Sequence, residues 1–152
     1  MKITKAVVRR MSLDFKVGFR TSFGLSTTKD FSIVELHDDD GNVGYGACSA
    51  FMRPWYNEET TMGALFVIKE YLIPSLFEAG DFKDPEWFFD HTSWIRRNRM
   101  ARASVDCPLW EPYSQEPGIP EYKTPGGGRD EIEAGGSPGL ADTPDKLPPT
   151  IE

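Results

Sequence analysis

The sequence predicts an α+β fold: a three-stranded antiparallel meander, then a small helical layer, then an irregular tail rich in proline and glycine. Three observations lead to this prediction. Apolar and polar residues alternate in the first 48 residues, as they do in half-buried strands. Apolar residues recur at helical spacing between residues 57 and 110, and strands followed by helices are typical of the α+β class. The tail, residues 111–152, holds 8 of the 12 prolines and 7 of the 14 glycines.

The meander is predicted from three alternating segments. Residues 2–19 form the first, which is long for one strand, so we expect a bend near Arg10. Residues 29–37 form the second and residues 43–48 the third. The acidic segment between them, residues 38–42, resembles half of a calcium loop but lacks the later glutamate, so we interpret it as a hairpin turn.

Capping residues mark two helix starts. Asn57 is followed by two glutamates, which favour the positive end of a helix dipole, and apolar residues then recur until Pro74, where we expect the helix to end. Asp84 before Pro85 predicts the second start, because proline is favoured at the first helical position.

A third helix is predicted to begin near Asn98. Pro108 and Pro112 fall inside it, and each removes a backbone hydrogen bond, so we expect a kink or an early end there. The helix would place four residues on one face: Met100, Ala103, Cys107 and Trp110.

Charge and composition exclude several function classes. Residues 1–110 hold 14 Lys and Arg against 15 acids, whereas residues 111–152 hold 3 against 9. Because the charges of residues 1–110 nearly cancel and form no basic face, the sequence argues against a nucleic-acid partner. No stretch approaches the roughly 20 apolar residues of a membrane span, and the start does not resemble a signal peptide, so we expect a cytoplasmic protein without a membrane partner.

Metal and nucleophilic chemistry find no support in the sequence. Cys48 and Cys107 have no partner spacing and are expected to be free buried thiols. With only two histidines besides, we predict no metal site. The acids of the turn at residues 38–40 and of the helix start at residues 58 and 59 are expected to be solvated, which makes them poor acid/base candidates. No serine lies beside a histidine or in a nucleophile-elbow motif. We therefore predict no catalytic residue.

Several motifs in a fixed order resemble one family. The chain is similar to the o-succinylbenzoate synthases and N-acylamino acid racemases of the enolase superfamily, in the muconate-lactonising subgroup. The resemblance covers nearly the whole chain. It is carried by residues 19–24, 40–46, 54–60 and 97–103, and by the later fragments 109–110, 118–120, 122–123, 126–127 and 129–133.

This resemblance implies the capping domain that members of the mandelate racemase/muconate lactonizing group carry in front of a modified barrel. Two cap loops, matching residues 18–26 and 50–56, shape the substrate pocket in such enzymes. The resemblance thus implies six substrate-binding residues of the complete enzyme: Phe19, Arg20, Phe23, Met52, Trp55 and Tyr56. Arg20 and Arg53 are candidates to steer a carboxylate.

The chemistry implied by the family is proton abstraction α to a carboxylate, with Mg²⁺ holding the enediolate. The lysine pair and the Asp/Glu/Asp metal ligands belong to barrel strands beyond residue 152, so we expect no cofactor in this chain and Mg²⁺ only in the full-length family. The expected partners are a barrel domain and, with it, a small carboxylate substrate.

The tail departs from the family pattern. Residues 1–110 are predicted to be the capping domain, and residues 111–152 a flexible or disordered remnant of the linker and first barrel strand. Residues 132–139 take the place of that strand, yet their glycines and proline would break it. Two explanations fit this departure. Either an excised domain was redesigned so that the surfaces exposed by removal of the barrel became polar, or the gene is damaged. Because the departures from the family pattern concentrate in the tail, we favour redesign.

Three hypotheses follow. The first is a capping domain without its own catalysis, and the second is a part of an active Mg²⁺-dependent racemase or dehydratase when a barrel completes it. The third is a binding module that uses the aromatic loops. The sequence leaves the substrate open, because lactonising, dehydrating and racemising members share the cap pattern. A homodimer through the apolar helix face near Met100, Cys107 and Trp110 is also plausible.

Overall fold

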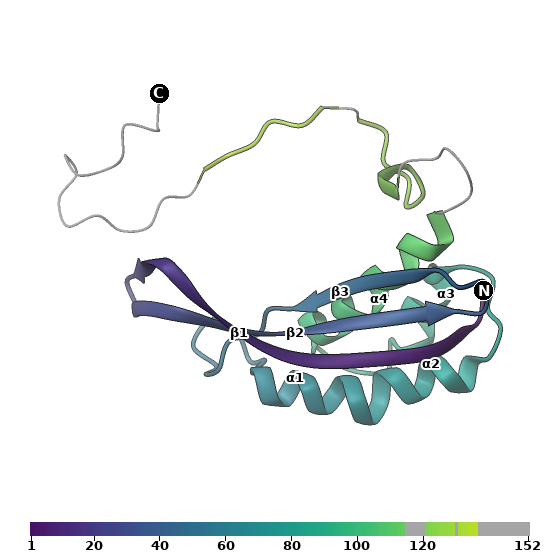
Figure 1. Ribbon diagram of the computed structural model, residues 1–152, viewed down its shortest axis with the longest axis horizontal. Coiled ribbons are helices and arrows are strands. Elements are labelled where there is room, and N and C mark those ends of the chain that lie inside the picture. Colours follow the sequence, from purple (N-terminus) through teal and green to yellow (C-terminus); the bar gives the residue numbers. More distant parts are fainter. Residues whose placement is uncertain (115–120, 130, 137–152) are drawn as a thin grey trace. The chain divides into compact units, whose positions relative to one another are not determined.

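The structure is a computed structural model that describes residues 1–114, 121–129 and 131–136 (Figure 1). Three antiparallel strands precede the helices, which confirms the predicted α+β class. The chain divides into two compact units, one formed by Met1–Met11 with Asp30–Gly128 and the other by Ser12–Lys29 with the residues from Arg129 onward.

The sheet contains β1 (Ile3–Thr21), β2 (Gly24–Asp38) and β3 (Val43–Cys48) in the order β1-β2-β3. The predicted turn after β2 is confirmed: the Asp38 carboxylate accepts hydrogen bonds from the backbone N–H groups of Asp40 and Asn42. On β2 and β3 alternate residues are buried, so one face of the sheet belongs to the core.

The first two strands are longer than predicted. Residues 18–26, expected as a loop, are the end of a β-hairpin, with only Ser22 and Phe23 between β1 and β2. Thr21 builds this tight turn because its hydroxyl accepts a hydrogen bond from the Phe23 N–H and donates one to the Gly24 carbonyl. Gly24 has a φ of +136°, which a residue with a side chain rarely adopts.

The first helical run is α1 (Thr61–Val67), η1 (Ile68–Leu72) and α2 (Ile73–Ala79). The predicted start at Asn57 is wrong, because the cap is Thr60, whose hydroxyl accepts from the Gly63 N–H.

The predicted stop at Pro74 is also wrong, because the helical run continues through it to Ala79. The segment η1 is a π-helix, and the Ile73 N–H bonds to the Ile68 carbonyl five residues back. This wider turn relieves the clash that a proline ring makes with an α-helical carbonyl four residues earlier.

The next two helices are α3 (Pro85–His91) and α4 (Arg99–Ser114). The predicted cap of α3 is confirmed, since the Asp84 carboxylate accepts from the Trp87 N–H at 3.0 Å. The four residues predicted to share one face of α4 are not its buried face: Ala103 and Cys107 are exposed, while a different stripe packs into the core. That stripe consists of Ala101, Ser104, Val105, Pro108, Leu109, Pro112 and Ser114.

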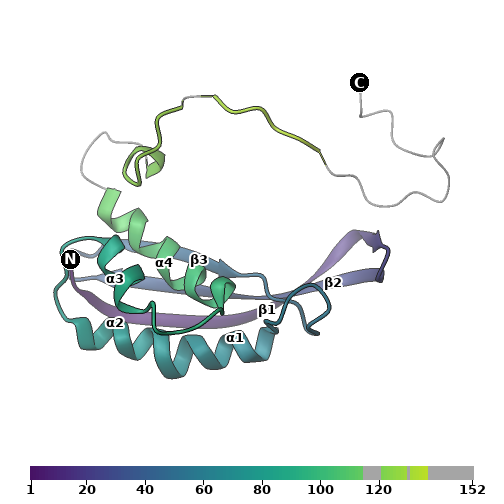
Figure 2. The same cartoon turned by 180° about the vertical axis from the view of Figure 1, so that it is seen from behind.

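Helix α4 lies along β3, as the view from behind shows (Figure 2). A Cβ on Gly44 would lie 1.9 Å from the Pro108 carbonyl oxygen, and one on Gly46 would lie 2.2 Å from the Ser104 carbonyl oxygen. Four residues of helix advance about 6 Å and two residues of strand about 6.6 Å, so each glycine meets one carbonyl.

A kink or an early end was predicted at the prolines of α4, and this contact explains why the early end does not occur. Pro108 and Pro112 have no N–H to bond the Ser104 and Pro108 carbonyls four residues earlier. Those two carbonyls are the ones that press against the glycines of β3, where the absence of side chains lets the helix backbone approach.

The core lies between the sheet and the helices. Its members with no exposed surface are Val34, Leu36, Ala50, Ile68, Leu72, Leu76, Ala101, Val105 and Leu109. In the described part of the tail, Glu121–Lys123 form a short 3-10 turn (η2), and residues 131–136 are exposed without helix or strand. The rest of the predicted flexible tail, residues 115–120, 130 and 137–152, lies outside the described residues. No helix in the described ranges is long and apolar enough to span a bilayer.

Candidate functional site

The first candidate substrate segment is a loop that leaves β3 and enters α1. Its two ends are joined at the base: the Thr61 hydroxyl donates to the Ala50 carbonyl at 2.8 Å, and the Thr61 N–H donates to the Phe51 carbonyl at 2.9 Å. Thr61 and Ala50 are both buried, so these bonds are shielded from water. We call residues 50–61 the closed loop.

Glu59 fastens the closed loop to the start of α4. Its carboxylate accepts hydrogen bonds from the N–H groups of Met100 at 2.8 Å and Ala101 at 3.0 Å, two of the groups that a helix N-terminus leaves without partners. The Glu59 side chain is 6% exposed, which corrects the expectation that it is solvated. A negative charge at this position also complements the helix dipole.

The backbone before α4 supports the same junction. Arg97 and Asn98 have φ values of +55° and +44°, in the left-handed region that costs energy for residues with side chains. The Asn98 side chain donates to the Arg96 carbonyl at 2.9 Å, which helps to hold this turn. The turn aims the first N–H groups of α4 at Glu59.

Arg10 on β1 holds the outer part of the closed loop. Its guanidinium donates to the Asp30 carboxylate at 3.0 Å and contacts the sulfur atoms of Met52 at 3.4 Å and Met62 at 3.9 Å. Met52, expected as a substrate-binding residue, is thus connected to the sheet. The sequence reasoning missed Arg10, Glu59 and Thr61, because nothing in a single sequence marks which arginine, acid or threonine meets a distant loop.

The closed loop presents a cluster of three aromatic rings. Phe51 lies 4.6 Å from Trp55 and 5.8 Å from Tyr56, measured between ring centroids, and Trp55 lies 5.9 Å from Tyr56. Phe51 and Trp55 are half-buried, whereas Tyr56 is 67% exposed and Met52 is 51% exposed. Three of the six expected substrate residues, Met52, Trp55 and Tyr56, are therefore on one fastened loop.

The other three expected substrate residues are on the hairpin tip. Phe19 is 47% exposed and Phe23 is 72% exposed, and Arg20 is also exposed. The tip is part of the second compact unit and the closed loop part of the first. Each of the two segments has exposed aromatic side chains: Tyr56 on the closed loop, and Phe19 and Phe23 on the hairpin tip.

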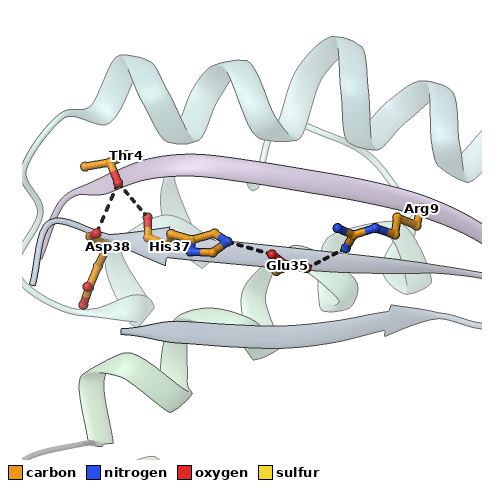
Figure 3. A network of polar contacts seen from close by, with 5 residues as sticks. All are labelled: Thr4, Arg9, Glu35, His37 and Asp38. Atoms are coloured by element: carbon orange, nitrogen blue, oxygen red, sulfur yellow. Dashed lines mark hydrogen bonds and ion pairs between the residues drawn. The ribbon is translucent and has the colours of Figure 1, made fainter. Parts of the chain in front are cut away.

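A separate polar network covers the outer face of the sheet (Figure 3). The Glu35 carboxylate accepts from the Arg9 guanidinium and lies 2.7 Å from His37 Nε2, and the Thr4 hydroxyl donates to the His37 and Asp38 carbonyls. The hydrogen bond from Arg9 is the main cause of a lowered pKa at Glu35, followed by that from His37. The network ties β1 to β2, and the Thr4 hydroxyl in it is already bonded to backbone carbonyls.

The described residues do not fit Mg²⁺. Within residues 1–114, 121–129 and 131–136, no group of three His, Cys, Asp or Glu side chains is placed to hold a metal ion. Asp38, the buried acid of the turn after β2, is already used by the backbone N–H groups of Asp40 and Asn42. We therefore derive no metal-dependent step from this chain.

The two thiols differ in exposure. Cys48 is 2% exposed, and its burial raises the pKa of the thiol, so the prediction of a buried thiol is confirmed there. Cys107 is exposed on α4, so the same prediction is wrong for it, because the core stripe of α4 runs along other residues.

Comparisons with known proteins identify the relatives of this chain. It is 36% identical over 152 residues to an o-succinylbenzoate synthase of Geobacillus kaustophilus, covering all of this chain and 40% of that enzyme. It is 30% identical over 140 residues to an N-succinylamino acid racemase of Thermus thermophilus, covering 92% of this chain and 37% of that protein. No family model matches the chain.

Solved structures agree with these relatives. A member of the enolase superfamily from Listeria innocua has a TM-score of 0.76 at 36% identity, over 83% of this chain and 34% of that one. A dipeptide epimerase from Cytophaga hutchinsonii, complexed with Mg and a dipeptide, has a TM-score of 0.72 at 28% identity, over 87% of this chain and 35% of that one. The chain spans about two fifths of the length of its curated relatives and corresponds to their N-terminal part.

Proposed function

We propose that this chain, a homologue of the o-succinylbenzoate synthases and N-succinylamino acid racemases with the capping-domain fold of the enolase superfamily, serves as the substrate-capping part of such an enzyme. Its task is to present aromatic loops to the substrate, while a barrel supplies the acid, base and metal ligands. No residue of this chain acts as a catalytic residue in the proposal.

The closed loop is the observation that carries the proposal. Thr61 closes the loop at its base, Glu59 binds it to the start of α4, and Arg10 contacts it at Met52. The loop also presents a cluster of aromatic rings. A rigid loop loses little conformational entropy when a ligand binds, and aromatic side chains contribute large contact areas. Both properties suit a loop that recognises an apolar acyl or aryl group of a carboxylate substrate.

The proposal keeps the six substrate-binding residues that the resemblance implies. Met52, Trp55 and Tyr56 contact the substrate from the closed loop, and Phe19, Arg20 and Phe23 do so from the hairpin tip. Arg20 is the candidate partner of the substrate carboxylate, since a guanidinium forms paired hydrogen bonds with a carboxylate.

The alternative is that the chain is part of an active Mg²⁺-dependent racemase or dehydratase. The epimerase relative from Cytophaga hutchinsonii is complexed with Mg, which favours a metal-dependent reaction once a barrel is present. Three expectations from the sequence stay predictions. They are the boundary between capping domain and tail at residue 110, the origin of the tail by redesign or damage, and the cytoplasmic location of the protein.

A chimera tests the proposal. Residues 1–114 of this chain replace the aligned N-terminal segment of the Geobacillus kaustophilus synthase, and turnover is measured with Mg²⁺ present. We expect a folded, active chimera in which Trp55→Ala raises KM roughly tenfold, as expected for one lost apolar contact, and changes kcat less.

The matched control is Trp94→Ala, which removes a tryptophan outside the closed loop and should leave KM unchanged. A folded chimera in which the two variants behave alike would overturn the assignment of Trp55. A chimera that does not fold would count against the proposal that this cap fits a barrel of that family.

A further inference from the structure

The sulfur atoms of two methionines lie against one guanidinium. Arg10 Nη2 donates to the Asp30 carboxylate at 3.0 Å and lies 3.4 Å from the Sδ atom of Met52, and Arg10 Nη1 lies 3.9 Å from the Sδ atom of Met62. Met52 belongs to the closed loop and Met62 to α1, and all four residues are in the first compact unit. Neither methionine belongs to the buried core, so core packing does not account for the arrangement.

These two methionines are the most exposed of the five in the chain. Met52 is 51% exposed and Met62 is 58% exposed, against 41% for Met11. Met100 is half-buried, and its sulfur lies 3.6 Å from the side-chain nitrogen of Asn57. Because an oxidant must reach the sulfur atom, we expect Met52 and Met62 to be oxidised before Met100.

Oxidation changes what Arg10 can bind at Met52. A thioether sulfur is a weak hydrogen-bond acceptor. A sulfoxide is polar, and a bond from a guanidinium to its oxygen is charge-assisted, a class about twice as strong as bonds between neutral groups. Arg10 Nη2 carries two hydrogen atoms, so it can keep its bond to Asp30 and donate the other hydrogen to the sulfoxide oxygen.

We propose that Met52 is a modification site for hydroperoxides, and that its sulfoxide oxygen binds Arg10 and tightens the closed loop against β1. In this step a lone pair of the Met52 sulfur attacks the terminal oxygen of the hydroperoxide. The S–O bond forms as the O–O bond breaks, so sulfur loses two electrons and the peroxide gains them. The proton on the transferred oxygen passes to the other oxygen, which leaves as an alcohol, or as water when the oxidant is hydrogen peroxide. The inference goes beyond the capping role and does not depend on it.

The position of Met52 links its oxidation to the loop. Thr61 and Glu59 hold the closed loop near its end at α1, whereas Arg10 contacts its outer part at Met52. Met62 lies in the first turn of α1, where the helix already holds the backbone. A sulfoxide at Met62 would therefore add a bond without holding the loop, which makes Met62 an internal comparison.

Amide hydrogen exchange of the chain before and after treatment with hydrogen peroxide tests the proposal. The reporter is the Trp55 N–H, which lies in the closed loop and donates to the Arg53 carbonyl at 2.9 Å. We expect peptide mapping to find an added oxygen on Met52, and exchange at Trp55 to slow about tenfold, because the added bond must break before the loop opens. Met52→Leu, treated in the same way, should show no slowing although Met62 is still oxidised.

Two neighbouring arginines provide the matched control. Arg10→Ala removes the proposed partner of the sulfoxide, whereas Arg9→Ala removes a guanidinium that binds Glu35. Each variant is compared with its own unoxidised form, so any change in the loop that precedes oxidation cancels. Oxidation should slow exchange at Trp55 in Arg9→Ala and should not do so in Arg10→Ala.

Three outcomes would overturn the proposal. The first is a Met52 that stays unmodified at a peroxide dose that oxidises Met100. The second is exchange at Trp55 that is unchanged or faster after oxidation, and the third is slowing that persists in Arg10→Ala. If Arg10→Ala does not fold, the Nη resonances of Arg10 give the same information: oxidation should shift them in the unsubstituted chain and not in Met52→Leu, and resonances that do not shift, or that shift in both, would exclude the bond.

Discussion

The closed loop and the hairpin tip both present aromatic residues expected to meet a substrate, yet they obtain their shapes in different ways. The bonds that hold the closed loop join residues far apart in the chain: Thr61 to Ala50, Glu59 to Ala101, and Arg10 to Met52. The bonds that shape the tip join Thr21 to Phe23 and Gly24, two and three positions away. The closed loop therefore depends on the tertiary fold, and the tip on its local sequence.

The change with the largest expected effect is Glu59→Ala. It removes the acceptor for the N–H groups of Met100 and Ala101 and leaves them without a partner at a buried helix start. Each hydrogen bond to a charged group contributes about 1.5–3 kcal/mol, so we expect the free energy of unfolding to fall by about 3 kcal/mol. Urea unfolding followed by circular dichroism measures this loss.

Glu58→Ala is the matched control, because the neighbouring Glu58 side chain is 53% exposed and lies 3.8 Å from Arg97. We expect it to lower the free energy of unfolding by less than about 0.5 kcal/mol. Alkylation of Cys48 gives a second readout: its burial and raised thiol pKa make it slow, and loss of the Glu59 anchor should speed it. Equal behaviour of the two variants would contradict the anchoring role.

The next largest effect is expected from Gly24→Ala. A side chain at a φ of +136° should cost about 1–2 kcal/mol in backbone strain. Because the tip is shaped locally, we expect faster amide hydrogen exchange at Phe23 and Leu25, and unchanged exchange in α4.

Gly128→Ala is the control for this prediction, since a Cβ there would meet no atom within 4 Å. It should leave exchange at the tip unchanged. Faster exchange in α4 after Gly24→Ala would show that the tip and the body open together, and the contrast between the two segments would then be lost.

The smallest effect is expected from Thr61→Val, which keeps the shape of the side chain and removes its hydroxyl. The lost bond to the Ala50 carbonyl should lower the free energy of unfolding by about 1 kcal/mol. Differential scanning calorimetry measures the change, with Thr28→Val on the exposed surface of β2 as the control. A control that loses as much as Thr61→Val would show that the loss does not come from the bond between the Thr61 hydroxyl and the Ala50 carbonyl.

Much of the fold could be predicted from local patterns. The alternation in residues 43–48 predicted β3 to the residue, the acidic cluster predicted the turn at Asp38, and Asp84 with Pro85 predicted the start of α3. Each of these signals depends on groups a few positions apart, so the sequence contains all the information that they need.

The errors came from prolines and from acids. Pro74 was expected to end a helix that continues, and Pro108 and Pro112 to kink or end a helix that in fact continues to Ser114. Glu59 was expected to be solvated and is buried on α4. In each case a partner distant in the chain or an unusual turn changed the outcome: the glycines of β3, the π-helix, and the start of α4.

The candidate site divides in the same way. Its aromatic residues could be named from the sequence through resemblance to a family, whereas the anchors Arg10, Glu59 and Thr61 could not. A resemblance names side chains that are expected to face a ligand, whereas the groups that hold the loop in place are identified only by their contacts in the folded chain.

The sequence by itself determined the order of strands and helices and the position of the turn at Asp38, because these depend on periodicity and on short-range hydrogen bonding. Its motifs also determined the family to which the chain is similar. Only the tertiary structure decided which face of α4 is buried, how its prolines are accommodated, and which acid holds the closed loop. Those outcomes depend on close approach between distant segments, as where the carbonyls of Ser104 and Pro108 meet the glycines of β3.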